Sequence, residues 1–256
     1  MKHVLLSAIA MFAVSGIQTA SAVEGQKDVF VESTFSDGSI IACPAMITQR
    51  GLVVTASHCT HKNGEQSKDF TVHIDARVDK SGEGIESRKS FDVPFENYHQ
   101  QAQGVVYENH DLSFLGNDLG IFYSEDVRSM VKSSALGWKP SEYPVTGYDA
   151  NGYDEKEPFY IRLPGGAYAK CKQKGSTVSG TEGARPAKCP KTVRIGHSGS
   201  PVFQKQDGEY FYVGFLSGGN AKFAGEKGEF WIIQTVGPNQ TIEVIRLAMS
   251  KSDDQT

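Results

Sequence analysis

The sequence of 256 residues has no apolar run beyond its amino terminus that is long enough to cross a membrane, which argues against an integral membrane protein. No lysine or arginine cluster stands out among the 26 basic residues, and the formal net charge is -4, which argues against a nucleic-acid-binding surface. The sequence also has no internal repeat and no low-complexity segment. With 39% hydrophobic residues it is typical of a globular protein with one large core or two small ones.

Residues 1–22 have the pattern of a secretory signal peptide. A short basic start precedes an apolar run over residues 4–17, and the small residues at 19–22 fit a cleavage site. We therefore expect a mature chain that begins at Val23 and is secreted or periplasmic.

Only four cysteines occur, and in an exported protein they indicate two disulfides, for which arithmetic alone allows three pairings. Closeness in the sequence favours Cys43 with Cys59, and Cys171 with Cys189 around a loop rich in lysine, glycine and serine. The rival use of Cys59 is a metal site with its neighbouring histidines at 58 and 61. Zinc sites usually show Cys-x-x-Cys or histidines separated by three to five residues, so we expect no metal here.

Short β-branched, aromatic or alternating segments separated by Gly, Pro and Asp turns predict a protein made mostly of strands. A final apolar pattern at helical spacing predicts one terminal helix after Asn239. The expected strands are residues 29–31, 39–43, 52–56, 70–76, 91–93, 159–161, 210–216 and 228–233.

Three short stretches carry side chains that together can perform nucleophilic chemistry. Ser198 lies in a Gly-His-Ser-Gly-Ser-Pro turn, where glycines allow a tight bend that exposes the hydroxyl. Taken alone, that stretch is equally typical of an ordinary turn. His58 follows a buried-looking strand and precedes a cysteine. Asp111 and Asp118 each precede an apolar residue and could orient an imidazole; Asp118 is favoured because Gly120 leaves more room than Ser113.

The order of these residues along the chain decides between the known triads. No histidine follows His197, which excludes the α/β-hydrolase order. An Asp-His-Ser order would need Asp28 or Asp37, and neither precedes a strand and helix of the required kind. The remaining order is His58, Asp118, Ser198.

These three motifs resemble those of chymotrypsin-fold (trypsin-like) serine peptidases, and the serine motif is most similar to bacterial glutamyl endopeptidases. The motifs are Thr-Ala-Ser-His-Cys at 55–59, Asn-Asp-Leu-Gly-Ile at 117–121 and Gly-His-Ser-Gly-Ser-Pro at 196–201. The resemblance implies an all-β fold of two antiparallel six-stranded β-barrels with a C-terminal helix. The first barrel would comprise residues 23–135, and the second barrel with the helix residues 136–256.

The resemblance also implies a role for each site residue. Ser198 would attack the scissile carbonyl, His58 would transfer the proton and Asp118 would orient His58. The N–H groups of Gly196 and Ser198 would form the oxyanion hole. Substrate would contact the base of the specificity pocket and the strand beside it, at Thr192, Ser217, Gly218 and Gly219.

Departures from the family pattern bear on activation and specificity. His197 stands where the animal digestive enzymes have an aspartate that pairs with the new amino terminus. Thr192 is not an acid, so we do not expect a preference for Lys or Arg. Leu216 aligns with the pocket histidine of glutamyl endopeptidases, and positive charge from Arg194, Lys222 or Lys227 is the remaining source for an acidic preference. Glycines 219 and 228 in the walls favour a bulky apolar or uncharged P1 residue.

The sequence thus predicts an exported monomeric serine endopeptidase that acts on proteins or peptides through an acyl-enzyme. It would need no cofactor and would bind neither nucleic acid nor membrane. The alternative is a catalytically silent binding or adhesion protein on the same fold, because fold does not fix function.

Overall fold

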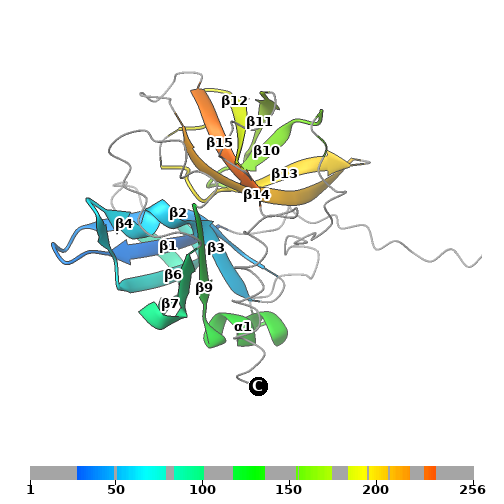
Figure 1. The fold of residues 1–256 in the computed structure, drawn as a ribbon. Helices are drawn as coiled ribbons and strands as arrows, with labels where there is room; N and C mark the ends of the chain where they lie inside the picture. Colours follow the sequence, from blue (N-terminus) through cyan, green and yellow to red (C-terminus); the bar gives the residue numbers. More distant parts are fainter. Residues whose placement is uncertain are drawn as a thin grey trace, which may run out of the picture.

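The computed structural model describes residues 28–48, 51–78, 84–100, 118–135, 154, 156–174, 184–194, 196–206, 208–219 and 228–234. The expected signal peptide and the expected C-terminal helix lie outside these residues. Every strand expected from the sequence overlaps a strand of the structure, and the two halves of the chain form separate sheets (Figure 1).

The first half forms a seven-stranded sheet, which we call the N-terminal sheet, in the order β7-β6-β1-β2-β3-β9-β8. The bounds of its strands are β1 Val29–Thr34, β2 Ile40–Ile47, β3 Leu52–Ala56, β6 Asp69–Val78, β7 Ile85–Val93, β8 Tyr98–Gln100 and β9 Leu119–Tyr123. The sequence predicted a six-stranded barrel here, and the structure does not confirm it, because the three-residue strand β8 adds a further member beside β9.

Three smaller elements and a helix join these strands. A 3₁₀ turn at Ser57–Thr60 leads from β3 into a two-stranded ribbon, β4 His61–Lys62 and β5 Glu65–Gln66, and a second 3₁₀ turn covers Phe95–Asn97. Helix α1, Glu125–Lys132, follows β9. Its first turn is capped by Ser124, whose side-chain oxygen accepts from the N–H of Val127.

The second half forms a closed barrel, which we call the C-terminal barrel, in the order β10-β11-β12-β15-β14-β13. Its strands are β10 Phe159–Arg162, β11 Tyr168–Gln173, β12 Ala184–Cys189, β13 Pro201–Gln206, β14 Glu209–Gly219 and β15 Gly228–Gln234. A separate apolar core fills it, centred on Phe159, Val202 and Phe230. This half matches the six strands expected from the resemblance.

Strands β3 and β9 are buried on both faces, which explains their continuous apolar sequences. Val53 and Phe122 face the core of the N-terminal sheet. Val54 and Ile121 face a second core, shared with Phe203 and other residues of the C-terminal barrel. Because β3 and β9 lie between two cores, whatever follows β3 or precedes β9 is placed at the boundary of the two halves.

Two further features fix the chain. The disulfides pair as the sequence favoured: Cys43–Cys59 joins β2 to the turn after β3, and Cys171–Cys189 joins the adjacent strands β11 and β12. At the start of β1, the carboxylate of Asp28 accepts from Arg162 Nη1 at 2.6 Å and from the N–H of Gly165 at 2.6 Å, and so links the first strand to the C-terminal barrel.

The helix in the described part of the chain is too short and too polar to cross a membrane.

Candidate active site

Backbone register brings the His58 and Asp118 stretches together. In the β3–β9 ladder Ala56 lies opposite Leu119, so the residue after β3 and the residue before β9 are neighbours at one end of the sheet. The N–H of Ser57 donates to the backbone carbonyl of Asp118 at 3.1 Å. A Cβ atom at Gly120 would lie 3.3 Å from the Tyr98 ring and 3.4 Å from the Ser57 backbone, so glycine allows both to pack closely against β9.

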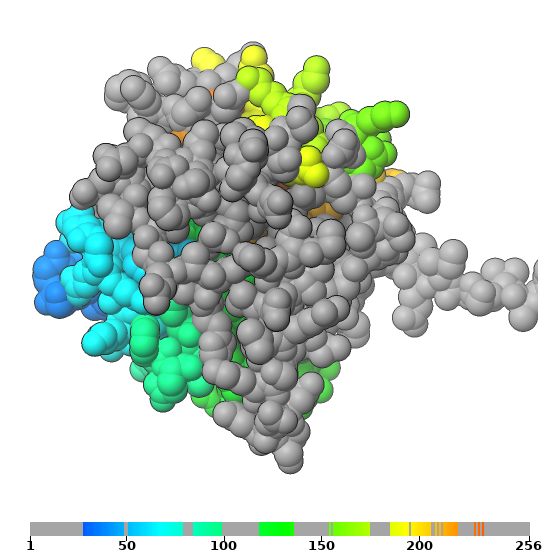
Figure 2. Space-filling model, viewed as in Figure 1, coloured from blue at the N-terminus to red at the C-terminus, as the bar shows by residue number. Residues whose placement is uncertain are grey.

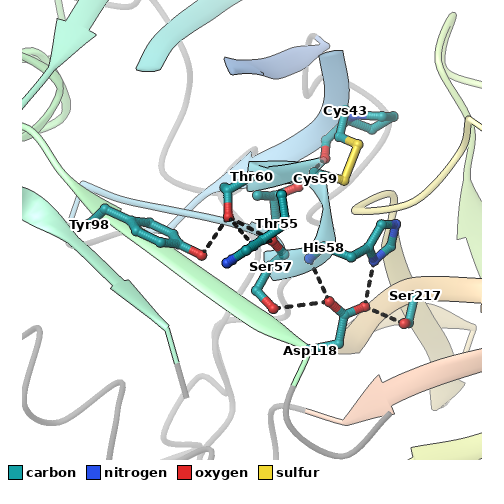
Figure 3. Close-up of polar contacts among 11 residues, drawn as sticks. Cys43, Thr55, Ser57, His58, Cys59, Thr60, Tyr98, Asp118 and Ser217 are labelled. Atoms are coloured by element: carbon teal, nitrogen blue, oxygen red, sulfur yellow. Dashed lines mark hydrogen bonds and ion pairs between the residues drawn. A yellow bond between two sulfur atoms is a disulfide. The ribbon is translucent and has the colours of Figure 1, made fainter. Parts of the chain in front are cut away.

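The carboxylate of Asp118 binds His58 twice (Figure 3). Oδ2 accepts from the ring Nδ1–H at 2.8 Å, and Oδ1 accepts from the backbone N–H of His58 at 2.8 Å. The contact orients the ring through Nδ1 and assigns proton exchange to the other ring nitrogen, Nε2. A carboxylate accepts only, so this contact also fixes the tautomer of the neutral imidazole.

Two hydroxyl groups complete the shell of donors around Asp118. Ser57 Oγ donates to Oδ1 at 3.1 Å, and Ser217 Oγ, from β14 of the other half, donates to Oδ2 (Figure 3). Sequence reasoning missed both contacts: it gave Ser217 to substrate and gave Ser57 no role. The sequence signal that could have indicated the role of Ser57 was its position as a hydroxyl residue between a buried strand and His58.

Burial and hydrogen bonding act in opposite directions on Asp118. Its side chain is 2% exposed, and burial alone would raise its pKa. The charge of His58 and the hydrogen bonds from His58 and Ser217 outweigh this effect, so the pKa of Asp118 lies below its ordinary value. The carboxylate therefore stays ionised and can stabilise a protonated His58.

The Cys43–Cys59 disulfide fixes the turn that carries His58. Thr60 Oγ1 donates to the carbonyl of Ser57 at 2.7 Å and lies 2.9 Å from the hydroxyl of Tyr98, which closes the turn on its other side. Cys59 is therefore a disulfide cysteine and cannot serve as a metal ligand.

The turn that carries Ser198 packs against the strands leading to His58. The N–H of Gly199 donates to the carbonyl of Leu216 at 2.6 Å, which ties the turn to β14. A Cβ atom at Gly199 would lie 2.0 Å from the Pro44 carbonyl oxygen and 2.2 Å from Thr55 Oγ1, at a φ of +84°. Glycine is required here because the turn touches the backbone of β2 and the side chain of β3 directly. Ser198 itself is half-buried.

Gly196 and His197 shape the turn before the serine. The N–H of His197 donates to the carbonyl of Arg194 at 3.2 Å, and Gly196 has a φ of +93°, a backbone conformation that favours glycine. His197 is buried, and its Nδ1 accepts from the N–H of Arg194 at 3.4 Å. Burial, together with the charge of Arg194, lowers the pKa of His197 to about 4, so the ring is neutral at pH 7.

The remaining expected site residues lie on the same half as Ser198. Thr192 is exposed in the turn after β12, and Ser217, Gly218 and Gly219 form the end of β14. Gly218 is half-buried and Gly219 is exposed, so this strand end is accessible.

The competing acids lie elsewhere. Asp28 pairs with Arg162, and Asp37 pairs with Lys62 at 2.7 Å, so neither contacts His58. Asp111 lies outside the described residues.

Comparison with known proteins supports this fold and shows the family of the chain. Residues 17–236 match the family model described as Trypsin. Protease Anisep from Arthrobacter nicotinovorans has a similar fold, with a TM-score of 0.59 and 11% sequence identity over 90% of this chain and 97% of that one. HL collagenase has a TM-score of 0.54 and 13% identity over 92% and 98% of the two chains. A search of curated proteins found no match.

The two solved structures share the fold, and the family match spans most of the sequence. The chain therefore belongs to the trypsin family and is a serine protease with a chymotrypsin-like fold.

Proposed function

We propose that the protein is an exported endopeptidase that cleaves peptide bonds through a triad of His58, Asp118 and Ser198. The observation that carries this proposal is the double contact of the Asp118 carboxylate with the backbone N–H and ring Nδ1–H of His58. Such a contact orients the imidazole and stabilises its protonated form, as required of a general base that activates a serine hydroxyl.

In this mechanism Ser198 Oγ attacks the scissile carbonyl carbon while His58 Nε2 takes the hydroxyl proton. The tetrahedral intermediate collapses to an acyl-enzyme, and His58 returns the proton to the leaving amine. Water, deprotonated by His58, then releases the acid and restores Ser198. Throughout, ionised Asp118 stabilises the imidazolium, and its burial among four donors supports this role.

The oxyanion hole is assigned to the N–H groups of Gly196 and Ser198. The positive φ of Gly196 supports this assignment, because glycine allows a tight bend that brings backbone N–H groups close to a substrate carbonyl. A donor of this kind contributes about 3 kcal/mol to the transition state.

Specificity is proposed for an uncharged P1 residue. Thr192 carries no charge to pair with Lys or Arg, and Leu216 supplies no histidine for an acidic residue. The serine motif still supports a place near the bacterial glutamyl endopeptidases. Of the candidate cations, Arg194 is exposed, while Lys222 and Lys227 lie outside the described residues.

A fluorophosphonate probe tests the nucleophile. We expect the disulfide-bonded wild-type protein to be labelled and Ser198→Ala to remain unlabelled, with Ser33→Ala as a matched control that keeps full labelling. An unlabelled wild-type protein would favour the silent binding protein instead.

The carboxylate is tested by Asp118→Asn, which we expect to lower kcat by about 10⁴-fold, because the amide cannot hold the correct imidazole tautomer. Asp111→Asn serves as the matched control and should retain near-normal kcat. The assignment of Asp118 would be refuted if Asp111→Asn lowered kcat strongly while Asp118→Asn kept near-normal kcat.

A further inference from the structure

A basic pocket of about 740 Å³ opens on the outside of the C-terminal barrel. Four lysines line it, and no carboxylate side chain is among its described lining residues, which are Lys156, Pro158, Lys170, Lys172, Gln173, Lys188, Cys189 and Pro190. Figure 2 shows residues of this part of the chain, in yellow-green and yellow, on the surface away from the blue and cyan N-terminal sheet. We call this the lysine pocket.

Strand geometry places three of the lysines on one surface. Along β11 Ala169 and Cys171 face the barrel core, so Lys170 and Lys172 point outward and are exposed. The β11–β12 register sets Lys188 directly opposite Lys172. Like charges directly opposite each other destabilise a sheet, so this arrangement favours an anion that lies between them.

Hydrogen bonds fix the backbone segment that carries the fourth lysine, Lys156. The backbone N–H of Lys156 donates to Asp154 Oδ1 at 2.7 Å. Gln173 Nε2 donates to the Asp154 carbonyl at 2.8 Å, and Gln204 Nε2 donates to the same oxygen at 2.6 Å. These amides fix the segment before β10 against the barrel and keep Lys156 at the pocket.

The described side chains form no ion pair with the lysines of the pocket, although Asp154 and Glu157 lie close to Lys156 in the sequence. By contrast, Lys62 on the other half pairs with Asp37 at 2.7 Å. Lys170 Nζ lies 5.9 Å from the centroid of the Tyr160 ring. The backbone register places Glu229 opposite Lys188 on the side away from β11, so Lys170 and Lys172 are the better probes. In a chain of net charge -4, this concentration of cations is a local exception.

We propose that the lysine pocket binds an extended acidic segment of polypeptide and so favours acidic protein substrates; the preference among substrates rests on the proposed endopeptidase function. Lys170 and Lys172 are two residues apart on a strand, which spaces their Cα atoms by about 6.6 to 6.8 Å. Alternate carboxylates of an extended peptide repeat at the same distance. The lysine stems and the prolines at 158 and 190 provide apolar surface for glutamate methylenes.

The first test measures binding in the Ser198→Ala protein, so it does not depend on catalysis. Fluorescein-labelled hexaglutamate is titrated at about 50 mM NaCl and followed by fluorescence anisotropy, with labelled hexaglutamine as the uncharged comparison. We expect hexaglutamate to bind, hexaglutamine not to bind, and the Lys170→Glu/Lys172→Glu double variant to bind hexaglutamate at least tenfold more weakly.

The matched control is Lys68→Glu/Lys132→Glu, which changes net charge equally on exposed lysines of the first half. It should keep the wild-type affinity. Equal weakening in both double variants, or no hexaglutamate binding with the lysines intact, would overturn the proposal. Dextran sulfate binding without hexaglutamate binding would overturn the peptide assignment. Thermal melting checks that each variant is folded.

The second test addresses substrate choice. One cleavable protein is prepared with a glutamate-rich or a glutamine-rich tail, and kcat/KM is compared. We expect the wild-type protein to favour the acidic tail and the Lys170→Glu/Lys172→Glu variant to lose that preference, with kcat on a short uncharged peptide unchanged. An equal preference in both proteins would refute the link to substrates. A protein that binds hexaglutamate but cleaves neither tail would refute the proposed function and leave the pocket assignment standing.

Discussion

His197 makes the stability of the fold depend on pH, and this can be measured. The ring is buried beside Ser198, and its pKa is lowered from 6.5 to about 4. The folded-state value lies below that of the unfolded chain, so the unfolded chain binds the extra proton first. The contribution of neutral His197 to the free energy of unfolding is therefore complete above about pH 6.5 and is lost as the pH falls toward about 4.

The magnitude follows from the size of the shift. Each pKa unit corresponds to about 1.4 kcal/mol, so the full shift corresponds to about 3 kcal/mol. Partial screening by solvent lowers this to about 2 kcal/mol. The variant His197→Asn removes the titration but keeps an acceptor, Oδ1, in the position from which Nδ1 accepts from the N–H of Arg194.

The assay is guanidinium unfolding at pH 7, 6, 5 and 4, followed by tryptophan fluorescence in the Ser198→Ala background to prevent self-cleavage. We expect the free energy of unfolding of the parent to fall by about 2 kcal/mol more than that of His197→Asn between pH 7 and pH 4. Groups such as Asp118 titrate in both proteins and cancel in the difference. Equal losses in the two proteins would refute the reasoning.

Two further substitutions test the packing and the cross-link of the second half. Gly199→Ala should lower the free energy of unfolding by about 2 to 4 kcal/mol, because its Cβ would overlap the Pro44 carbonyl and Thr55. The control Gly208→Ala, at a φ of +87° in open space, should lower it by only about 1 kcal/mol. Similar losses for both variants in denaturant unfolding would contradict the contact. Replacing both Cys171 and Cys189 by serine opens a link between residues 18 apart and should cost about 3 kcal/mol in the same assay, and a loss below about 1 kcal/mol would show that the bridge does not constrain the unfolded chain.

Local sequence patterns predicted the strands, because strands depend on short-range signals, whereas the pairing of His58 with Asp118 was predicted from the ordered motifs and the family resemblance. Alternation and β-branched runs indicate strands, and a glycine after an acid at a strand start indicates close approach, as at Gly120. The order of the motifs along the chain then left the order His, Asp, Ser, with Asp118 favoured over Asp111.

Contacts set by register and closure could not be predicted in this way. The Ser57 and Ser217 bonds to Asp118 depend on how β3 meets β9 and how the two halves pack. The sequence described Cys171 and Cys189 as the ends of a lysine-rich loop, whereas they lie on adjacent strands, and only that pairing gathers Lys172 and Lys188. The seventh strand of the first sheet, β8, is too short to be distinguished from a loop.

The Asp28 contact has a consequence for when the protein acquires its structure. Asp28 is synthesised early, but its partner Arg162 follows 134 residues later. A contact of such long sequence separation carries a high loop-closure cost and forms late in folding. The link between the first strand and the C-terminal barrel therefore forms only after the β10–β11 hairpin has been made, although β1 itself pairs with β2 and β6. A chain that is still crossing a membrane, as proposed here, would lack this anchor and would also lack Ser217 beside Asp118, so peptide cleavage would begin only after the whole protein had reached its destination.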